Sequence, residues 1–281
     1  MSKSWLIETD ELERELQAPD FVIIDASWHM PDEGKDARAE YLEEHIPGAL
    51  FFDIDEIADT KSPFPHMLAP PEKFSSRMRA MGIGDGSRIV VYDNQGLFSA
   101  ARVWWTFRVM GVEDVSVLNG GLPKWKREGR PLDSGEPPVR STRHFTARRN
   151  LDLVRDVDDV KTVLKDHSAE IVDARSPERF AGKVPEPRPG LRGGHIPGAH
   201  NLPFQKLLNK DGTLKPAKEL EAMFHDAGVD LTKPVIASCG SGITASILAL
   251  ALAETGHRRM AVYDGSWAEW GADQSLPVET G

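Results

Sequence analysis

The chain has 281 residues and a formal net charge of −10, with 40% hydrophobic and 28% charged residues, as in ordinary globular proteins. Its acidic balance argues against a nucleic-acid partner, and its single cysteine excludes an internal disulfide and a cysteine-rich zinc site. No run approaches the ~20 apolar residues of a membrane span, and the first residues lack the apolar core of a secretion signal. We therefore expect a cytoplasmic protein that binds no metal, cofactor or membrane.

The first half of the chain alternates short apolar runs with amphipathic segments. This alternation of strands and helices is typical of an α/β domain with a mostly parallel sheet. In chain order, the patterns predict a helix over 9–17, a strand over 21–25, a helix over 71–81 that closes at Gly82, a strand over 89–92, a helix over 97–110 and a strand over 115–118.

The second half shows the same order of elements after a segment of different composition. Residues 130–155 are rich in Pro, Ser and Arg and have no clear period, so we interpret them as a connection. After it, the patterns predict helices over 157–166, 216–227 and 244–253, and strands over 171–173, 235–238 and 261–263.

Four sequence blocks of the first half recur in the same order in the second half. The block His45-Ile-Pro-Gly-Ala49 returns letter for letter at 195–199, and weaker matches pair 21–27 with 171–176, 89–93 with 235–239, and 118–125 with 263–270. Such spacing indicates two copies of one domain. We expect an α/β chain of two tandem domains, each a mostly parallel sheet flanked by helices, with bounds 1–138 and 156–281 and a linker over 139–155.

Several aromatic residues and histidines recur with the repeat. The two histidines His45 and His195 appear in both copies, so a structural role in a turn is favoured over catalysis. Five tryptophans are better explained by packing than by ligand stacking: Trp104, Trp105, Trp125, Trp267 and Trp270.

Cys239, the only cysteine, stands where the strand over 235–238 gives way to a loop of small residues and then a helix. Consecutive backbone N–H groups and the positive end of the helix dipole make such a loop a cradle for negative charge. A sulfur held there is favoured as a thiolate, so we interpret Cys239 as a nucleophile. The first copy carries Asp93 at this position, which cannot hold a persulfide, so the chemistry is expected in the second copy.

Two other interpretations of this loop compete with the nucleophile. Cys239 could be a buried small hydrophobic residue, as most free cysteines are. Residues 240–245 also fit the dinucleotide-binding pattern G-x-G-x-x-A, with Asp264 at the end of a later strand. Too few residues follow Asp264 for the further strand–helix units that a dinucleotide site needs.

Taken together, the tandem α/β domains, the doubled H-I-P-G-A and the Cys239 loop resemble the rhodanese superfamily. The loop Cys-Gly-Ser-Gly-Ile-Thr at 239–244 is similar to that of the members that use mercaptopyruvate, whereas members that use thiosulfate carry basic residues there. The resemblance implies a rhodanese fold and the transfer of sulfur from 3-mercaptopyruvate, through a persulfide on Cys239, to a thiol or cyanide acceptor. Thioredoxin is a candidate thiol acceptor.

The resemblance also implies roles for particular residues. Arg179 and Arg188 fall on the positions of the substrate arginines, and a guanidinium suits a keto acid because it binds a carboxylate bidentately. Ser241, His66 and Asp55 fall on a proposed proton relay. The loop residues Gly240, Gly242, Ile243 and Thr244 complete the expected donor site. Without the resemblance, surface ion pairs of Arg179 with Glu178 and of Arg188 with Glu186, and simple packing of His66, would be favoured.

Three alternative functions stay open at this point. A thiosulfate:cyanide sulfurtransferase is the nearest alternative, and a non-enzymatic persulfide carrier would keep Cys239 but need no substrate arginines. A phosphatase of the same fold would need an arginine six residues after the cysteine, where this chain has Ala245. The phosphatase is therefore disfavoured.

Overall fold

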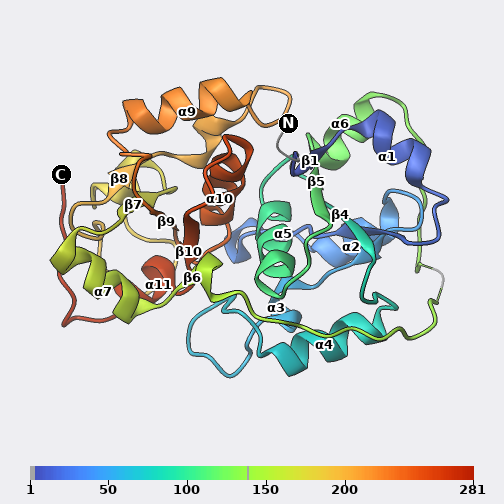
Figure 1. Ribbon diagram of the computed structural model, residues 1–281, viewed down its shortest axis with the longest axis horizontal. Helices are drawn as coiled ribbons and strands as arrows, with labels where there is room; N and C mark the ends of the chain where they lie inside the picture. Colours follow the sequence, from blue (N-terminus) through green and yellow to red (C-terminus); the bar gives the residue numbers. More distant parts are fainter. Residues whose placement is uncertain (1–3, 138) are drawn as a thin grey trace. The chain divides into compact units, whose positions relative to one another are not determined.

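The computed structural model describes residues 4–137 and 139–281, so the expected domain boundary at residue 138 lies outside the described residues. The chain forms two compact units (Figure 1), and each gathers segments that are separate in the sequence. Unit 1 holds residues 4–60, 68–137, 139–150 and 209–214; unit 2 holds 61–67, 151–208 and 215–281. The segment 61–67 thus belongs by its contacts to unit 2, although the sequence predicts it as part of the first copy.

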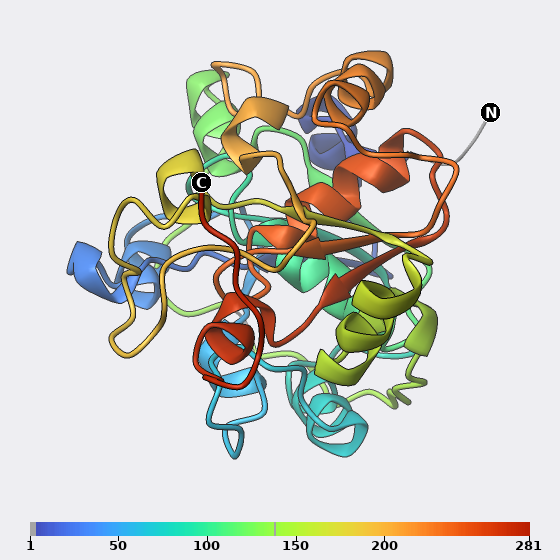
Figure 2. The same cartoon turned by 90° about the vertical axis from the view of Figure 1, so that its left-hand side faces the viewer.

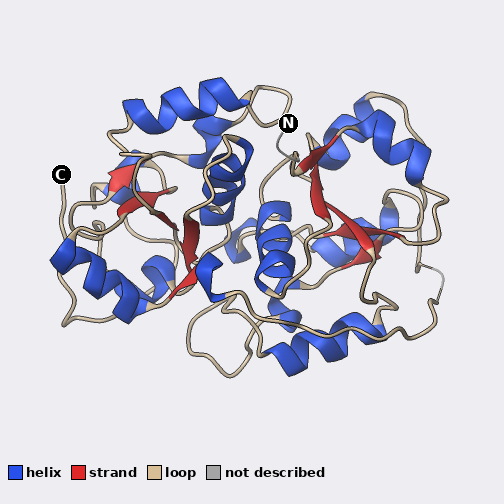
Figure 3. Ribbon diagram, viewed as in Figure 1, coloured by secondary structure: helices blue, strands red, loops and turns tan. Residues whose placement is uncertain are grey.

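Each unit is built on a sheet of five parallel strands (Figure 3). The order is β1-β5-β4-β2-β3 in unit 1 and β6-β10-β9-β7-β8 in unit 2, so the two sheets share one topology. The strands of unit 1 are β1 (Leu6–Ile7), β2 (Phe21–Asp25), β3 (Leu50–Phe51), β4 (Arg88–Tyr92) and β5 (Val115–Leu118). Those of unit 2 are β6 (Val154–Arg155), β7 (Glu170–Asp173), β8 (His200–Asn201), β9 (Val235–Ser238) and β10 (Met260–Tyr263).

Helices flank both sheets, as the sequence predicts (Figure 2). In unit 1 they are α1 (Thr9–Glu15), α2 (Ala37–Glu43), α3 (Ile54–Ile57), α4 (Pro71–Ala80), α5 (Ala100–Val109) and α6 (Gly121–Arg127). In unit 2 they are α7 (Val157–Asp166), α8 (Pro177–Phe180), α9 (Ala217–Asp226), α10 (Ala245–Glu254) and α11 (Ser266–Trp270). None of the helices in the described part of the chain is both long and apolar enough to cross a membrane.

The central strand and helix of unit 2 follow directly from their composition. All four residues of β9 are buried, as a strand covered on both faces requires. The helix α10 is apolar around its whole circumference, and its residues from Ala245 to Ala253 are all buried. Such a helix is stable only when it is enclosed. Because β9 and α10 are both fixed in the core, the loop between them has a fixed start and a fixed end.

The helices α7 and α11 pack against the sheet of unit 2 through an apolar cluster that includes Val160, Ile236 and Tyr263. Trp267 and Trp270 belong to the same cluster and are fully buried. Three further tryptophans are fully buried in unit 1: Trp104, Trp105 and Trp125. The prediction that the five tryptophans serve packing is confirmed.

The structure contains short elements that the sequence patterns did not predict: the helices α2, α3, α6, α8 and α11 and the two-residue strands β1, β3, β6 and β8. The predicted connection over 130–155 ends in β6, which pairs with β10 at the edge of the second sheet. A strand of two residues shows no period, so neither β6 nor β1 could be recognised. The helix predicted to start at residue 97 starts at Ala100, and the N–H groups of Phe98 and Ser99 before it donate to the Asp93 carboxylate.

Candidate active site

The loop that begins at Cys239 is tied to the start of α11 by backbone hydrogen bonds. The Trp267 N–H donates to the Cys239 carbonyl (3.0 Å), and the Ala268 N–H donates to the Gly240 carbonyl (2.8 Å). The Cys239 N–H donates to Ser266 Oγ (3.2 Å), and Ser266 has a left-handed φ of 48°. Cys239 itself is 2% exposed. The backbone at the cysteine is therefore held on both sides, in keeping with a site that must present one atom precisely.

The corresponding loop of unit 1 surrounds the side chain of Asp93 with backbone N–H groups. Asp93, the counterpart of Cys239, is fully buried, and its Oδ2 accepts from the N–H groups of Phe98 (2.7 Å), Ser99 (2.9 Å) and Ala100 (2.9 Å). A carboxylate thus sits where these amides and the start of α5 converge. Unit 2 repeats the strand, loop and helix with a sulfur in place of the carboxylate. The role of Cys239 as a nucleophile stays a prediction.

His66 and Ser241 lie together within unit 2. His66 Nδ1 is 2.9 Å from Ser241 Oγ, and both residues are buried. His66 has a φ of 61°, a conformation that costs of order 1–3 kcal/mol outside glycine and persists only where its surroundings enforce it. Asp55 lies in α3 of unit 1, where its Oδ2 accepts from Trp28 Nε1 (3.0 Å). The relay role of these residues stays a prediction.

Two guanidinium groups converge on the backbone next to the cysteine. A Cβ atom built on Gly240 would lie 3.1 Å from Arg179 Nη2 and 3.8 Å from Arg188 Nη1. Arg179 is carried by the short helix α8, and Arg188 by the irregular segment that follows it. The two arginines named from the resemblance are therefore neighbours of the loop, and Gly240 leaves them room.

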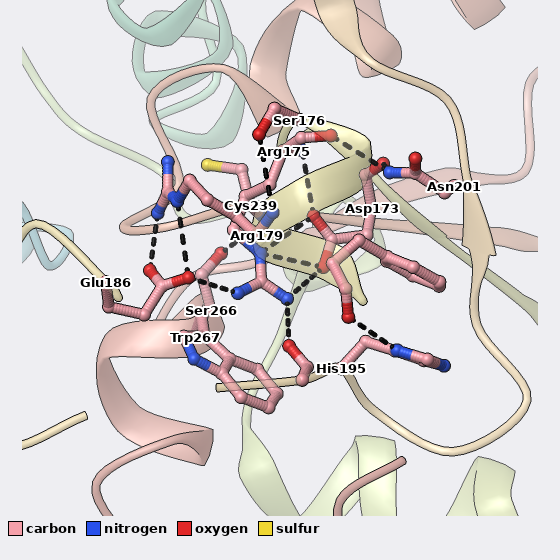
Figure 4. A network of polar contacts seen from close by, with 12 residues as sticks. Asp173, Arg175, Ser176, Arg179, Glu186, His195, Asn201, Cys239, Ser266 and Trp267 are labelled. Atoms are coloured by element: carbon pink, nitrogen blue, oxygen red, sulfur yellow. Dashed lines mark hydrogen bonds and ion pairs between the residues drawn. The ribbon is translucent and has the colours of Figure 1, made fainter. Parts of the chain in front are cut away.

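The side chain of Arg179 forms an ion pair with Glu186, not with the adjacent Glu178. Its Nε and Nη2 donate to the Glu186 carboxylate at 3.2 and 2.5 Å (Figure 4), so Arg179 pairs with Glu186 rather than with Glu178, the pair favoured without the resemblance. The Glu186 side chain is only 1% exposed. It also accepts from Arg175 Nη1 (2.9 Å), and Arg175 is in turn paired with Asp173 (2.7 Å).

Sequence reasoning missed Asp173, Arg175 and Glu186 as part of this site. Burial alone would lower the pKa of Arg175, but the two carboxylates outweigh it and the pKa is raised, so this guanidinium stays charged. One signal could have found it: the second copy has Arg175 where the first has Ser27, two residues after the matched aspartate.

The repeated histidines have the predicted structural role. His45 Nδ1 lies 2.8 Å from the Tyr41 carbonyl and His195 Nδ1 lies 2.8 Å from the Phe180 carbonyl, so each ring binds backbone. Each also forms an isolated bridge to a later part of its own unit. Among the described residues no group of three or more His, Cys, Asp or Glu is arranged to hold a metal ion.

Replacing Gly240 by alanine is a direct test of the space beside the arginines. The added Cβ would approach Arg179 Nη2 to 3.1 Å, so the end of that side chain must move by a few tenths of an ångström. We expect normal folding and a several-fold rise in KM for an anionic donor, with a smaller change in kcat, because carboxylate binding is perturbed and the sulfur is not. Thermal unfolding and steady-state kinetics measure both, and an unchanged KM would contradict this geometry.

Comparisons with known proteins agree with one another. Residues 8–128 and 156–273 each match the model of the rhodanese-like domain. The chain is 45% identical over 280 residues to 3-mercaptopyruvate sulfurtransferase of Escherichia coli strain K12, with 99% of both chains covered. It is 42% identical over 295 residues to thiosulfate/3-mercaptopyruvate sulfurtransferase 1, mitochondrial, of Arabidopsis thaliana, covering 98% of this chain and 78% of that one. The crystal structure of SseA from Escherichia coli, described among 3-mercaptopyruvate sulfotransferases, matches with a TM-score of 0.87 and 42% identity over 94% of this chain and 99% of that one.

Proposed function

The chain belongs to the rhodanese family, and we propose that it moves the sulfur of 3-mercaptopyruvate through a Cys239 persulfide to a thiol or cyanide acceptor, with release of pyruvate. The observation that carries this proposal is the convergence of Arg179 and Arg188 on Gly240, directly beside the only cysteine. The names of the relatives from Escherichia coli and Arabidopsis support the same donor.

In the first half-reaction the Cys239 thiolate attacks the donor sulfur. A sulfur–sulfur bond forms, the carbon–sulfur bond breaks, and its electron pair leaves on pyruvate as the enolate. Arg179 and Arg188 hold the donor's carboxylate and stabilise the developing enolate oxygen. The donor's thiol proton passes through Ser241 to His66, and a proton returned to carbon completes pyruvate.

In the second half-reaction the acceptor attacks the outer sulfur of the persulfide. The outer sulfur–Cys239 bond breaks and the cysteine leaves as a thiolate, so the enzyme is restored without any oxidant or reductant. The backbone N–H groups of Gly240, Gly242, Ile243 and Thr244 stabilise the anionic sulfur at both stages. Thioredoxin as a thiol acceptor and a cytoplasmic location belong to this proposal as well.

Donor choice is tested by initial rates with mercaptopyruvate and thiosulfate side by side, using one thiol acceptor. Residues 240–244 carry no charge, whereas a compact dianion such as thiosulfate gains from cations next to the sulfur. We expect mercaptopyruvate to be favoured by on the order of 10²-fold in kcat/KM. A preference for thiosulfate would instead support the thiosulfate activity in the name of the Arabidopsis relative.

A further inference from the structure

Glu186 is a buried carboxylate that joins two arginines of unit 2 (Figure 4). Its Oε1 accepts from Arg175 Nη1 (2.9 Å) and from Arg179 Nε (3.2 Å), and its Oε2 accepts from Arg179 Nη2 (2.5 Å). A carboxylate with 1% exposure is costly to bury unless its charge is compensated, and here two cations compensate it. Its position is therefore fixed by both partners.

Arg175, the partner that lies deeper in unit 2, is held by several contacts of its own. Its Nε and Nη2 donate to Asp173, its Nη2 also donates to the Gly194 carbonyl (2.8 Å), and its guanidinium lies 4.3 Å over the ring of Trp267. Side-chain exposure is 1% for Arg175 and 2% for Asp173. Glu186 is thus anchored to the core rather than to the solvent-exposed surface.

Glu186 contacts only one edge of the guanidinium of its other partner, Arg179. The Nε–Nη2 edge is used, and the Nη1–Nη2 edge keeps two parallel N–H groups, which match a carboxylate. The Arg179 side chain is 23% exposed, so the protein covers it only in part. Nη2 is also the atom that a Cβ on Gly240 would meet at 3.1 Å, which places the edge beside Cys239.

We propose that Glu186 is a positioning residue, which holds Arg179 by one edge so that the other edge receives the donor's carboxylate next to Cys239. The proposal rests on the proposed function for the nature of the donor. It extends that function by assigning carboxylate recognition to a chain of contacts, Asp173–Arg175–Glu186–Arg179, which starts in the core.

Two hypotheses for Glu186, that it repels an anionic donor by its charge or that it positions Arg179, predict opposite results for Glu186→Gln. If the carboxylate acted through its charge alone, it would repel an anionic donor, and its removal would improve carboxylate binding. If it positions Arg179, its removal frees that guanidinium and weakens carboxylate binding. Folding should persist, because Arg175 keeps its contacts to Asp173 and Gly194.

Alkylation of Cys239 tests this without any sulfur transfer. Iodoacetate carries a carboxylate and iodoacetamide does not, and Cys239 is the only thiol in the chain. We define the alkylation ratio as the rate with iodoacetate divided by the rate with iodoacetamide. This ratio is expected to fall roughly 5-fold in Glu186→Gln and in Arg179→Gln, and to fall no further in the double variant. An alkylation ratio that rises or stays unchanged in Glu186→Gln overturns the proposal. So does a double variant whose ratio lies as far below that of Arg179→Gln as the ratio of Glu186→Gln lies below that of the wild type.

Kinetics give the second readout. In Glu186→Gln, KM for mercaptopyruvate should rise by a factor similar to the change in the alkylation ratio, while kcat changes less. Glu178→Gln is the matched control, because it removes a neighbouring charge on α8 without touching the Arg179–Glu186 pair. If Glu186→Gln does not fold, Arg179→Lys replaces it: a lysine keeps the charge but cannot use two edges, so an unchanged alkylation ratio would overturn the proposal. Should mercaptopyruvate prove not to be the donor, the alkylation ratio still decides the role of Glu186.

Discussion

Cys239→Ser is expected to abolish sulfur transfer. Serine lacks a polarisable thiolate, so no persulfide can form, and loss of the nucleophile in covalent catalysis costs on the order of 10⁶-fold in kcat. Incubation of the wild-type chain with donor alone should add one sulfur atom, which cyanide removes, and the variant should add none. Intact-protein mass spectrometry and a turnover assay measure the two effects.

The neighbouring residue provides the matched control for this substitution. Ser238 is buried at the end of β9, and its Oγ has no hydrogen-bond partner among the described residues. Ser238→Ala therefore removes a buried hydroxyl beside the cysteine without breaking a hydrogen bond, and should leave persulfide formation unchanged. A Cys239→Ser chain that still turns over donor, or still gains sulfur, would remove Cys239 from the mechanism.

The repeat explains why much of the fold was predictable. Longer strands such as β2 and β9 are continuous apolar runs, and the matched blocks show that each unit contains the same set. The position of Cys239 at the end of β9 follows from that pattern alone. The edge strands β1 and β6 are two residues each, and their pairing depends on the neighbouring strand rather than on their own sequence.

The site was less predictable because its contacts are made between segments without regular structure. Glu186 lies in an irregular stretch between α8 and β8, where no period shows which way a side chain points. Its pairing with Arg175 and Arg179 depends on how that stretch folds back on α8. Likewise, the segment that contains His66 belongs by its contacts to unit 2, which no local pattern reveals.

The second large effect is expected at His66. A proton-transfer group contributes typically 10²–10⁴-fold, so its removal should lower the rate of persulfide formation by about that factor. The substitution should be His66→Asn rather than alanine, since His66 has a φ of 61° and asparagine tolerates the left-handed region. Asparagine can still bond Ser241 Oγ but cannot accept and return a proton.

The two half-reactions separate this role from packing. Transfer of the outer sulfur from a preformed Cys239 persulfide to cyanide requires no donor thiol proton, so His66→Asn should slow persulfide formation and spare its discharge. His167→Asn is the matched control: His167 also has a left-handed φ, 52°, but caps the end of α7 and should leave both half-reactions unchanged. Rapid-mixing measurements of each half-reaction decide the matter. If persulfide formation in folded His66→Asn stays within a few-fold of wild type, or if both half-reactions slow equally, His66 packs under the loop and moves no proton.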